Sequence, residues 1–189
     1  MPREVSTLAL VPRVVDAVAP RPVAAAGGIA DGRGLVAALA LGAQAAVIGT
    51  RFLASGESRA HPDYKKKLLA ANENDTVRTT LFGFSWPNAP HRALRTRFVE
   101  EWLGKEARGQ ESRTDEPVIG HNVISGQQMP LQHFMGFPPN VNATGDIESM
   151  GLLAGQGVGL VREVKPAEEI VRELVNDARE IISRLSNER

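Results

Sequence analysis

The stretch from Pro22 to Thr50, PVAAAGGIADGRGLVAALALGAQAAVIGT, has the pattern of two short buried strands joined by a helix. The first strand, a small apolar run over residues 22–26, ends at the pair Gly27-Gly28. The second, over residues 45–48, ends at Gly49-Thr50. Neither run alternates polar with apolar residues, which is typical of parallel strands that are covered on both faces. The strand starts lie about 22 residues apart, the length of one βα unit.

The helix between the two strands has local start and stop signals. Asp31 is a residue type that favours the N-cap, so we predict a helix over residues 32–41. Gly42 follows at the position where glycine commonly ends a helix. This strand–helix–strand order predicts an α/β fold with a parallel sheet.

The glycines at the two strand ends indicate a phosphate site. In a (β/α)8 barrel the turns after the seventh and eighth strands commonly bind phosphate. Glycine lets backbone N–H groups approach a phosphate, and the start of a helix adds a favourable dipole. The alternative is that Gly27 and Gly28 only form a tight turn. Arg51, directly after the second turn, is either an additional cation for the phosphate or half of an outward ion pair.

The same stretch resembles a known family. AAGGIADGRGLVAALALGAQAAVIGTRFL, residues 25–53, is similar to the nitronate monooxygenases, formerly called 2-nitropropane dioxygenases. The similarity continues through PNAPHRALRTRF and through PPNVNATGDIESMGLLAGQGVGLVREVKPAEEIV, so it covers most of the chain. Related flavin barrels share only the looser pattern of two glycines after one strand and Gly-Thr after the next.

The resemblance implies an FMN-dependent TIM-barrel enzyme that oxidises alkyl nitronates with O2 to a carbonyl compound and nitrite. The residues that it implies for binding FMN are Gly27, Gly28, Gly49 and Thr50. It also implies a place for Gln156 on the substrate side of the flavin, where its amide could contact an oxyanion or a flavin carbonyl. An ordinary helix-ending turn is the alternative for Gln156, and Leu153 replaces an aromatic residue of many members.

The resemblance covers only the C-terminal half of the family sequence. In the family, a glycine-rich motif ending in the histidine that acts as catalytic base precedes the helix that we predict over residues 7–18. We therefore expect the base upstream of this chain and no catalytic residue within it. A full barrel takes about 250 residues and eight strands, of which this chain offers the last two βα units. A truncated gene, a separately encoded N-terminal half, a partial gene model and a complete small domain stay open.

The expected organisation has three parts. The last two βα units of the FMN-binding barrel occupy residues 1–56, and a mostly helical cap or substrate domain occupies residues 57–150. A return segment with the final barrel helix occupies residues 151–189, and apolar residues at three- and four-residue spacing place that helix over residues 166–185.

Coarser predictions describe the rest of the chain. We expect helices over residues 61–72, 91–103 and 146–154, and a strand or extended segment over residues 76–81. Apolar and aromatic side chains at helical spacing within 91–103 predict that this helix packs onto a core. Residues 118–144 are expected to be loop-rich, because prolines interrupt them.

Composition excludes several classes of function. Lys and Arg together number 22, as do Asp and Glu, so no bulk charge attracts nucleic acid or an acidic membrane. The absence of cysteine removes disulfides and thiolate chemistry and fits a cytoplasmic protein. No apolar run approaches the roughly 20 residues of a membrane span. The four histidines lack the spacing of a metal site. The ligands that the resemblance implies are FMN, a small nitronate and O2.

Two other functions stay open. One is another FMN- or phosphate-binding barrel oxidoreductase, either like a flavin-dependent enoyl-acyl-carrier-protein reductase or like IMP dehydrogenase. A reductase would oxidise NADH or NADPH, whereas IMP dehydrogenase chemistry uses a cysteine nucleophile that this chain lacks. The other is an inactive fragment, or one half of a split protein.

Overall fold

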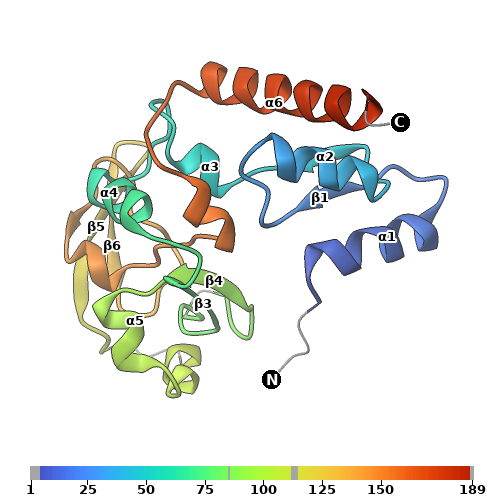
Figure 1. Ribbon diagram of the computed structural model, residues 1–189. Helices are drawn as coiled ribbons and strands as arrows, with labels where there is room; N and C mark the ends of the chain where they lie inside the picture. The colour runs from blue at the N-terminus through green and yellow to red at the C-terminus, as the bar shows by residue number, and fades with distance from the viewer. Residues whose placement is uncertain (1–4, 85, 112–114, 188–189) are drawn as a thin grey trace. The chain divides into compact units, whose positions relative to one another are not determined.

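The computed structural model describes residues 5–84, 86–111 and 115–187, and the chain divides into two compact units (Figure 1). Unit 1 comprises the described residues up to Glu57 and from Glu163 onward. Unit 2 comprises the described residues between Ser58 and Arg162.

Unit 1 contains the parallel strand pair predicted from the sequence. Its elements are α1 (Thr7–Val18), β1 (Ala24–Ala26), α2 (Gly32–Ala40), β2 (Ala45–Val47), α3 (Thr50–Leu53) and α6 (Ala167–Asn187). Strand β1 pairs with β2 in parallel, and Ala26 lies opposite Val47. At the start of the pair, the Val23 N–H donates to the Gln44 side-chain oxygen at 2.7 Å, and the Gln44 N–H donates to the Val23 carbonyl at 2.9 Å. These two bonds hold the register of strands that are only three residues long.

The helices of unit 1 cover one face of this strand pair. Ala25 and Ala46 point into an apolar cluster with Val11 of α1 and Ala38 of α2. The side chains of the other face are those of Ala24, Ala26, Ala45 and Val47, which are largely exposed. The sequence pattern predicted cover on both faces, and the structure shows an exposed apolar face instead, with Val47 at 59% exposure.

Helix α6 packs against α2 at close range (Figure 1). Its buried side chains are Ile170, Leu174 and Ala178, which follow the spacing of one helical face. The first residue of α2, Gly32, lies directly against the α6 backbone: a Cβ there would clash with the Cβ of Asp177 and lie 2.7 Å from the Ala178 nitrogen. The helix over 166–185 was thus predicted correctly, but the contact that holds it was not visible in the sequence.

Unit 2 is richer in strands than predicted. Its elements are α4 (Pro62–Ala70), β3 (Thr76–Thr79), β4 (His91–Leu94), α5 (Arg97–Trp102), β5 (Val118–Ile124), β6 (Gln127–Gln132), β7 (Thr144–Gly145) and the 3₁₀ turns η1 (Glu106–Gln110), η2 (Ile147–Ser149) and η3 (Gln156–Leu160). Strand β3 pairs with β4, and the order of the second sheet is β6–β5–β7. The prediction of a mostly helical domain over 57–150 is therefore wrong.

The β5–β6 hairpin explains most of this error. Ser125 and Gly126 both have positive φ angles, 52° and 80°, and they connect Ile124 to its partner Gln127. Two successive residues of positive φ make the tight turn whose twist matches that of a hairpin. The Ser-Gly pair was a usable turn signal, but the prolines of this segment dominated the loop-rich prediction for 118–144.

The predicted helix over 91–103 is a strand followed by a shorter helix. Strand β4 pairs with β3 through Val77 opposite Ala93. Helix α5 then starts at the N-cap Thr96, whose side-chain oxygen accepts the Val99 N–H at 3.2 Å. Pairing with β3 therefore overrides the helical spacing in the first part of the segment.

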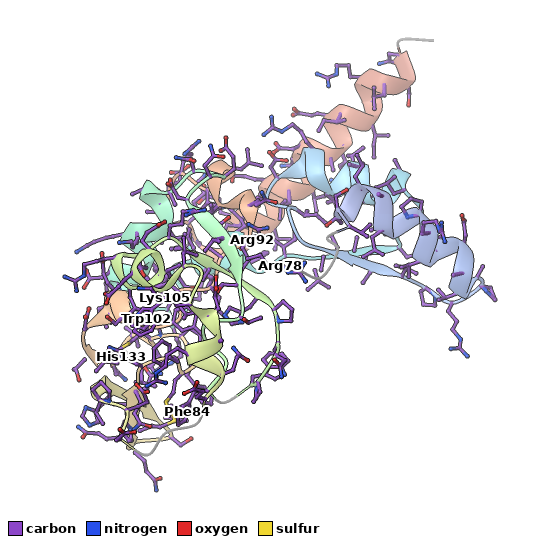
Figure 2. All side chains as sticks on the ribbon, turned by 90° about the horizontal axis from the view of Figure 1, so that it is seen from below. Arg78, Phe84, Arg92, Trp102, Lys105 and His133 are labelled. Carbon is purple, nitrogen blue, oxygen red and sulfur yellow. The ribbon has the colours of Figure 1, made fainter. Side chains whose placement is uncertain are left out.

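A hydrophobic core includes residues of α5, and Phe84 and Trp102, labelled in Figure 2, pack against it. Its buried members are Leu81, Phe82, Ala93, Phe98, Val99 and Phe134. The Phe98 ring centroid lies 4.9 Å from that of His133 and 6.3 Å from that of Trp102. The Lys105 ammonium lies 5.8 Å from the Trp102 ring centroid, at the exposed rim. The aromatics of 91–103 thus pack into a core, as predicted.

Residues 151–162 pack within unit 2, so this unit extends past the predicted boundary at 150. The Leu94 N–H donates to the Leu152 carbonyl at 2.8 Å, and the Tyr64 hydroxyl donates to the Leu153 carbonyl. The single turn η2 replaces the helix predicted over 146–154.

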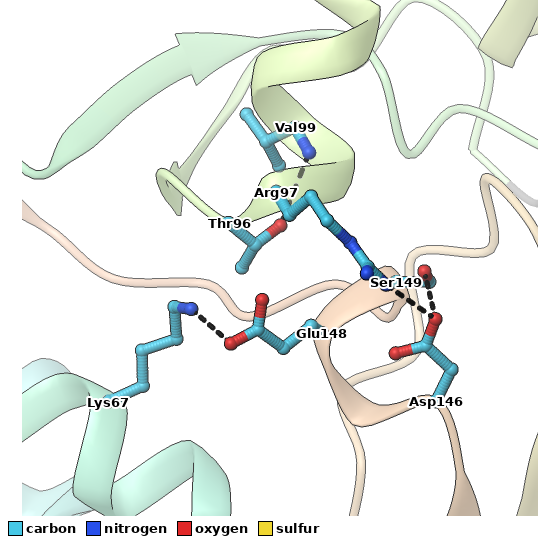
Figure 3. Close-up of polar contacts among 7 residues, drawn as sticks. All are labelled: Lys67, Thr96, Arg97, Val99, Asp146, Glu148 and Ser149. Carbon is cyan, nitrogen blue, oxygen red and sulfur yellow. Dashed lines mark hydrogen bonds and ion pairs between the residues drawn. The ribbon is translucent and has the colours of Figure 1, made fainter.

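Polar contacts fix η2 to its neighbours (Figure 3). Glu148 pairs with Lys67 of α4. Asp146 accepts the Ser149 hydroxyl at 2.8 Å and lies 3.5 Å from the Arg97 guanidinium of α5. The turn has its own backbone hydrogen bonds, from the Ser149 N–H to the Asp146 carbonyl at 3.1 Å and from the Met150 N–H to the Ile147 carbonyl at 3.2 Å, and the ion pairs attach it to two helices.

The close approach of α2 to α6 yields the first prediction. Gly32→Ala should lower the free energy of unfolding by about 1–3 kcal/mol, because the new methyl group overpacks the contact with Asp177 and Ala178. Urea denaturation followed by circular dichroism measures the change. Gly56→Ala is the matched control, since a Cβ there meets no heavy atom within 4 Å, and it should change stability by less than about 0.5 kcal/mol. Equal effects of the two variants would contradict the proposed packing.

Candidate functional site

The first glycine turn directly follows β1 and needs glycine at both positions. Gly27 and Gly28 have φ angles of 98° and 75°, in the left-handed region that other residues rarely adopt. A Cβ on Gly27 would lie 3.3 Å from the Thr7 side-chain oxygen, whereas a Cβ on Gly28 would meet no heavy atom of the described residues within 4 Å. The turn is thus packed on the side of Gly27 and open on the side of Gly28.

The second glycine turn follows β2 and starts helix α3. Gly49 is the N-cap of α3, and Thr50 is its first residue. The Gly49 carbonyl accepts the Leu53 N–H at 3.0 Å, which closes this single helical turn. Gly49 has an ordinary negative φ of −96°, so its backbone does not require glycine. A Cβ there would again meet no heavy atom within 4 Å, so its absence leaves space beside the backbone.

The parallel register brings the two turns to the same edge. Because Ala26 lies opposite Val47, both strands reach their carboxyl ends together, and each is followed within two residues by its open glycine. Within the described part of the chain, the N–H groups of Gly28 and Gly49 donate no hydrogen bond. Two backbone donors without side chains at one strand edge are suited to an anionic group such as a phosphate.

The start of α2 is already satisfied by the protein. The Asp31 carboxylate accepts the N–H groups of Arg33 at 3.0 Å and Gly34 at 3.2 Å, which confirms Asp31 as the predicted N-cap. Burial raises the pKa of Asp31, but the hydrogen bonds from Arg33 and Gly34 outweigh burial and hold the pKa below its ordinary value. These two N–H groups at the start of α2 are therefore already paired within the protein.

Thr7 was not identified from the sequence. Its hydroxyl, at the first turn of α1, donates to the Gly27 carbonyl at 3.2 Å and lies 3.4 Å from the Ala26 carbonyl. The contact joins residues 20 positions apart in the chain, so no local pattern indicates it. Thr7 fixes the first turn from the helix side of the sheet.

Arg51 has a role that neither sequence-based alternative described. Its side chain is buried, and its Nη1 atom donates to the Glu163 carbonyl at 3.2 Å. It is therefore not half of an outward ion pair, because its Nη1 donor is directed at the backbone of the return segment.

Gln156 belongs to unit 2, whereas the glycine turns belong to unit 1. It is the first residue of η3, and its side chain is exposed. The next residues, Gly157 to Gly159, are buried, and Glu73 packs against Gly159. The structure thus provides an exposed amide on a well-packed turn, and the substrate-side role of Gln156 stays a prediction.

The four histidines all lie in unit 2, at positions 61, 91, 121 and 133. His61 accepts the Asp63 N–H at the start of α4. The His91 Nδ1–H donates to the Ala89 carbonyl at 2.9 Å, and burial lowers the pKa of His91. Burial likewise lowers the pKa of His133, beside Phe98.

Across residues 5–84, 86–111 and 115–187, no three metal-binding side chains form a cluster, and no helix has the length and apolar character to cross a membrane.

Comparison with known proteins finds a family model and curated relatives that match most of this chain. The model of the nitronate monooxygenase family matches residues 1–177. A nitronate monooxygenase of the fungus Metarhizium robertsii is 37% identical over 186 residues, which are 94% of this chain and 47% of that protein. This chain thus spans about half the length of the curated relatives it matches.

Solved structures show the same relationship. FabK from Thermotoga maritima is 34% identical with a TM-score of 0.73, over 99% of this chain and 53% of that chain. A nitroalkane oxidase from Streptomyces ansochromogenes is 31% identical with a TM-score of 0.68, over 95% of this chain and 45% of that chain. Both neighbours match this chain over about half of their own length, so its α/β fold corresponds to one half of each.

The contact of Thr7 with the first turn gives a second prediction. Thr7→Val keeps the side-chain shape but removes the hydroxyl, and should lower the free energy of unfolding by about 0.5–1.5 kcal/mol. Thr7→Ser keeps the donor and should retain most of that free energy. Urea denaturation of the three proteins measures both changes. Indistinguishable stabilities of the Val and Ser variants would show that the hydroxyl does not hold the turn.

The buried histidine gives a third prediction, on pH. Burial holds the pKa of His91 below the value of about 6.5 for an unfolded histidine, so the unfolded state binds more protons. Stability should therefore be full above about pH 6.5 and fall as the pH is lowered further. His91→Asn, which can still donate to the Ala89 carbonyl, should weaken this dependence in urea denaturation between pH 7.5 and 5.5. An unchanged slope would contradict the assignment, since His133 titrates in both proteins.

Proposed function

This chain belongs to the nitronate monooxygenase family, and we propose that it forms the phosphate-binding part of an FMN-dependent nitronate monooxygenase. The proposed reaction is the oxidation of an alkyl nitronate by O2 to a carbonyl compound and nitrite. The proposed phosphate ligands are backbone groups of Gly27, Gly28, Gly49 and Thr50. Bound FMN would supply the electron-transfer chemistry that amino-acid side chains lack.

One observation carries this proposal: two open glycine turns lie at one carboxyl edge of a parallel strand pair. Gly28 and Gly49 combine a backbone N–H that donates no hydrogen bond within the described residues with free space where a Cβ would lie. A phosphate needs several donors at close range, and side chains at these positions would hold it away. The residues present therefore fit the phosphate of FMN.

The exposed face of the strand pair supports a place in a larger barrel. In a (β/α)8 barrel the helices cover the outer face of the sheet, and the inner face is filled by side chains of the other strands. The exposed side chains of β1 and β2 are three alanines and Val47, which are suited to such an interior. We propose that the other strands and the catalytic base correspond to the half of the relatives that this chain does not match. Those strands would be supplied by the same polypeptide or by a separate N-terminal half.

From the family resemblance alone, Gln156 of unit 2 is proposed as a substrate-side residue. Gln156 offers an exposed amide on the buried turn η3, and such an amide can donate to a nitronate oxygen or to a flavin carbonyl. Because η3 is packed against Glu73, the amide would be presented from a rigid segment.

A second candidate function shares the same phosphate site. It is a flavin-dependent reductase like the enoyl-acyl-carrier-protein reductases, which we place ahead of an IMP dehydrogenase-like enzyme because this chain lacks the cysteine that IMP dehydrogenase chemistry uses. The two remaining candidates differ in their electron donor. A reductase consumes NADH or NADPH, whereas the nitronate reaction consumes the nitronate and O2.

The fourth prediction tests flavin binding. FMN should bind this chain more tightly than riboflavin, which lacks the phosphate, in titrations followed by flavin fluorescence. Gly49→Val should remove most of that difference, because its side chain fills the open space at the turn, while Ala37→Val, at an exposed position of α2, leaves it intact. Equal affinities for FMN and riboflavin would refute the phosphate site.

Activity separates the two candidate functions. The chain alone is expected to bind FMN weakly and to turn over slowly, because the catalytic base is not among its proposed residues. Nitrite release and oxygen uptake with propionate 3-nitronate, measured beside NADH and NADPH oxidation, identify the electron donor. A stoichiometric yellow protein with rapid turnover would refute the expectation for the isolated chain, and NADH oxidation without nitrite would favour the reductase.

A further inference from the structure

The segment that follows the second glycine turn is joined to the segment that leads into α6. The Gly56 N–H donates to the Lys165 carbonyl at 2.9 Å, and the Lys165 N–H donates to the Ala54 carbonyl at 3.2 Å. The Glu57 carboxylate accepts the Ala167 N–H at 2.9 and 3.0 Å, at the start of α6. We call residues 51–57 together with residues 163–167 the clasp.

Arg51 is the buried charge of the clasp. Its side chain is 7% exposed, and its Nη1 atom donates to the Glu163 carbonyl at 3.2 Å. Burial lowers the pKa of its guanidinium, and the nearby Glu173, Glu163 and Glu169 act in the opposite direction. A cation at this depth is costly unless hydrogen bonds and opposite charges compensate it, so its geometry is strongly constrained.

Lys165 forms ion pairs with the same acidic side chains that act on Arg51. Its ammonium lies 3.0 Å from the Glu163 carboxylate and 3.6 Å from that of Glu169, and it also pairs with Glu173. The same three glutamates therefore balance Arg51 and Lys165. This arrangement ties the charge of Arg51 to the first two turns of α6.

The position of the second glycine turn depends on contacts of this kind. Helix α3 is only four residues long, too short to be stable through its own hydrogen bonds. The bond from the Leu53 N–H to the Gly49 carbonyl closes the turn internally but does not place it relative to the sheet. Arg51 immediately follows Thr50, so its hydrogen bond to Glu163 anchors the turn from the outside.

We propose that Arg51 is a positioning residue, which holds the Gly49–Thr50 turn at the FMN phosphate by anchoring it to the return segment at Glu163. The inference rests on the proposed function, since the phosphate is the group that the turn would bind. It assigns Arg51 no contact with the phosphate itself. Its effect on flavin binding is therefore indirect and specific to the phosphate-dependent part of the affinity.

The test compares FMN with riboflavin in Arg51→Met and Arg51→Lys. Arg51→Met should weaken FMN binding about tenfold, the loss expected for a hydrogen bond from a charged group, and change riboflavin binding by less than about twofold. Arg51→Lys keeps the charge but loses the planar donor group, and should fall between wild type and Arg51→Met. Arg172→Met, which removes an exposed ion pair with Glu168 on α6, is the control and should leave both affinities unchanged.

Hydrogen exchange provides a readout that needs no flavin. In Arg51→Met, exchange should accelerate over residues 49–57 and 163–167 and stay unchanged over the described part of unit 2. If Arg51→Met fails to fold, Arg51→Lys is used for both measurements. Equal losses of FMN and riboflavin affinity, or an unchanged exchange pattern, would overturn the positioning role. Equal binding of FMN and riboflavin by the wild type would instead refute the proposed function, while the exchange measurement still tests the clasp.

Discussion

The parallel pairing of β1 with β2 is the contact on which the candidate site depends. It places Ala26 opposite Val47, so that the two glycine turns leave the sheet at one edge. The strands are short, and the paired bonds between Val23 and Gln44 fix the register at their amino ends. A slip of one strand by one residue would turn its inward side chain, Ala25 or Ala46, out of the core and offset the two open glycines, because side chains alternate between the faces of a strand.

The glycines in the stretch from Pro22 to Thr50 serve two separate physical purposes. Gly32 allows the backbone of α6 to pack against the start of α2, and Gly27 leaves room for the hydroxyl of Thr7. At Gly28 and Gly49, in contrast, a Cβ would meet no heavy atom of the described residues within 4 Å. Composition alone does not separate packing from binding, since both favour glycine. The structure separates them by showing which absent side chain would clash and which would lie in open space.

Charged side chains connect segments within each unit through ion pairs. In unit 1, three glutamates pair with Lys165 and also offset the charge of the buried Arg51. In unit 2, Asp146 and Glu148 connect η2 to α5 and α4 through Arg97 and Lys67. These charges are balanced locally, which agrees with a chain whose acidic and basic residues are equal in number. The proposed anion site therefore relies on backbone N–H groups rather than on a surplus of side-chain cations.

The sequence by itself determined the parts of the fold that local signals encode. The Asp31 N-cap, the end of α2 at Gly42, the two strands and the long amphipathic helix α6 all follow from residue types within a few positions of each element. In unit 2 such signals were weaker. Residues 91–94 have helical spacing but form a strand, because pairing with β3 is a long-range interaction that a local pattern does not contain.

Only the tertiary structure decided which residues surround the candidate site. The convergence of the two turns depends on strand register, the bracing of Gly27 by Thr7 joins positions 20 residues apart, and the hydrogen bond of Arg51 spans 112 residues. Sequence motifs identified the glycines because their chemistry is local to the turn. The residues that hold those turns in place are found only after folding, because chain distance carries no information about contacts formed across the core.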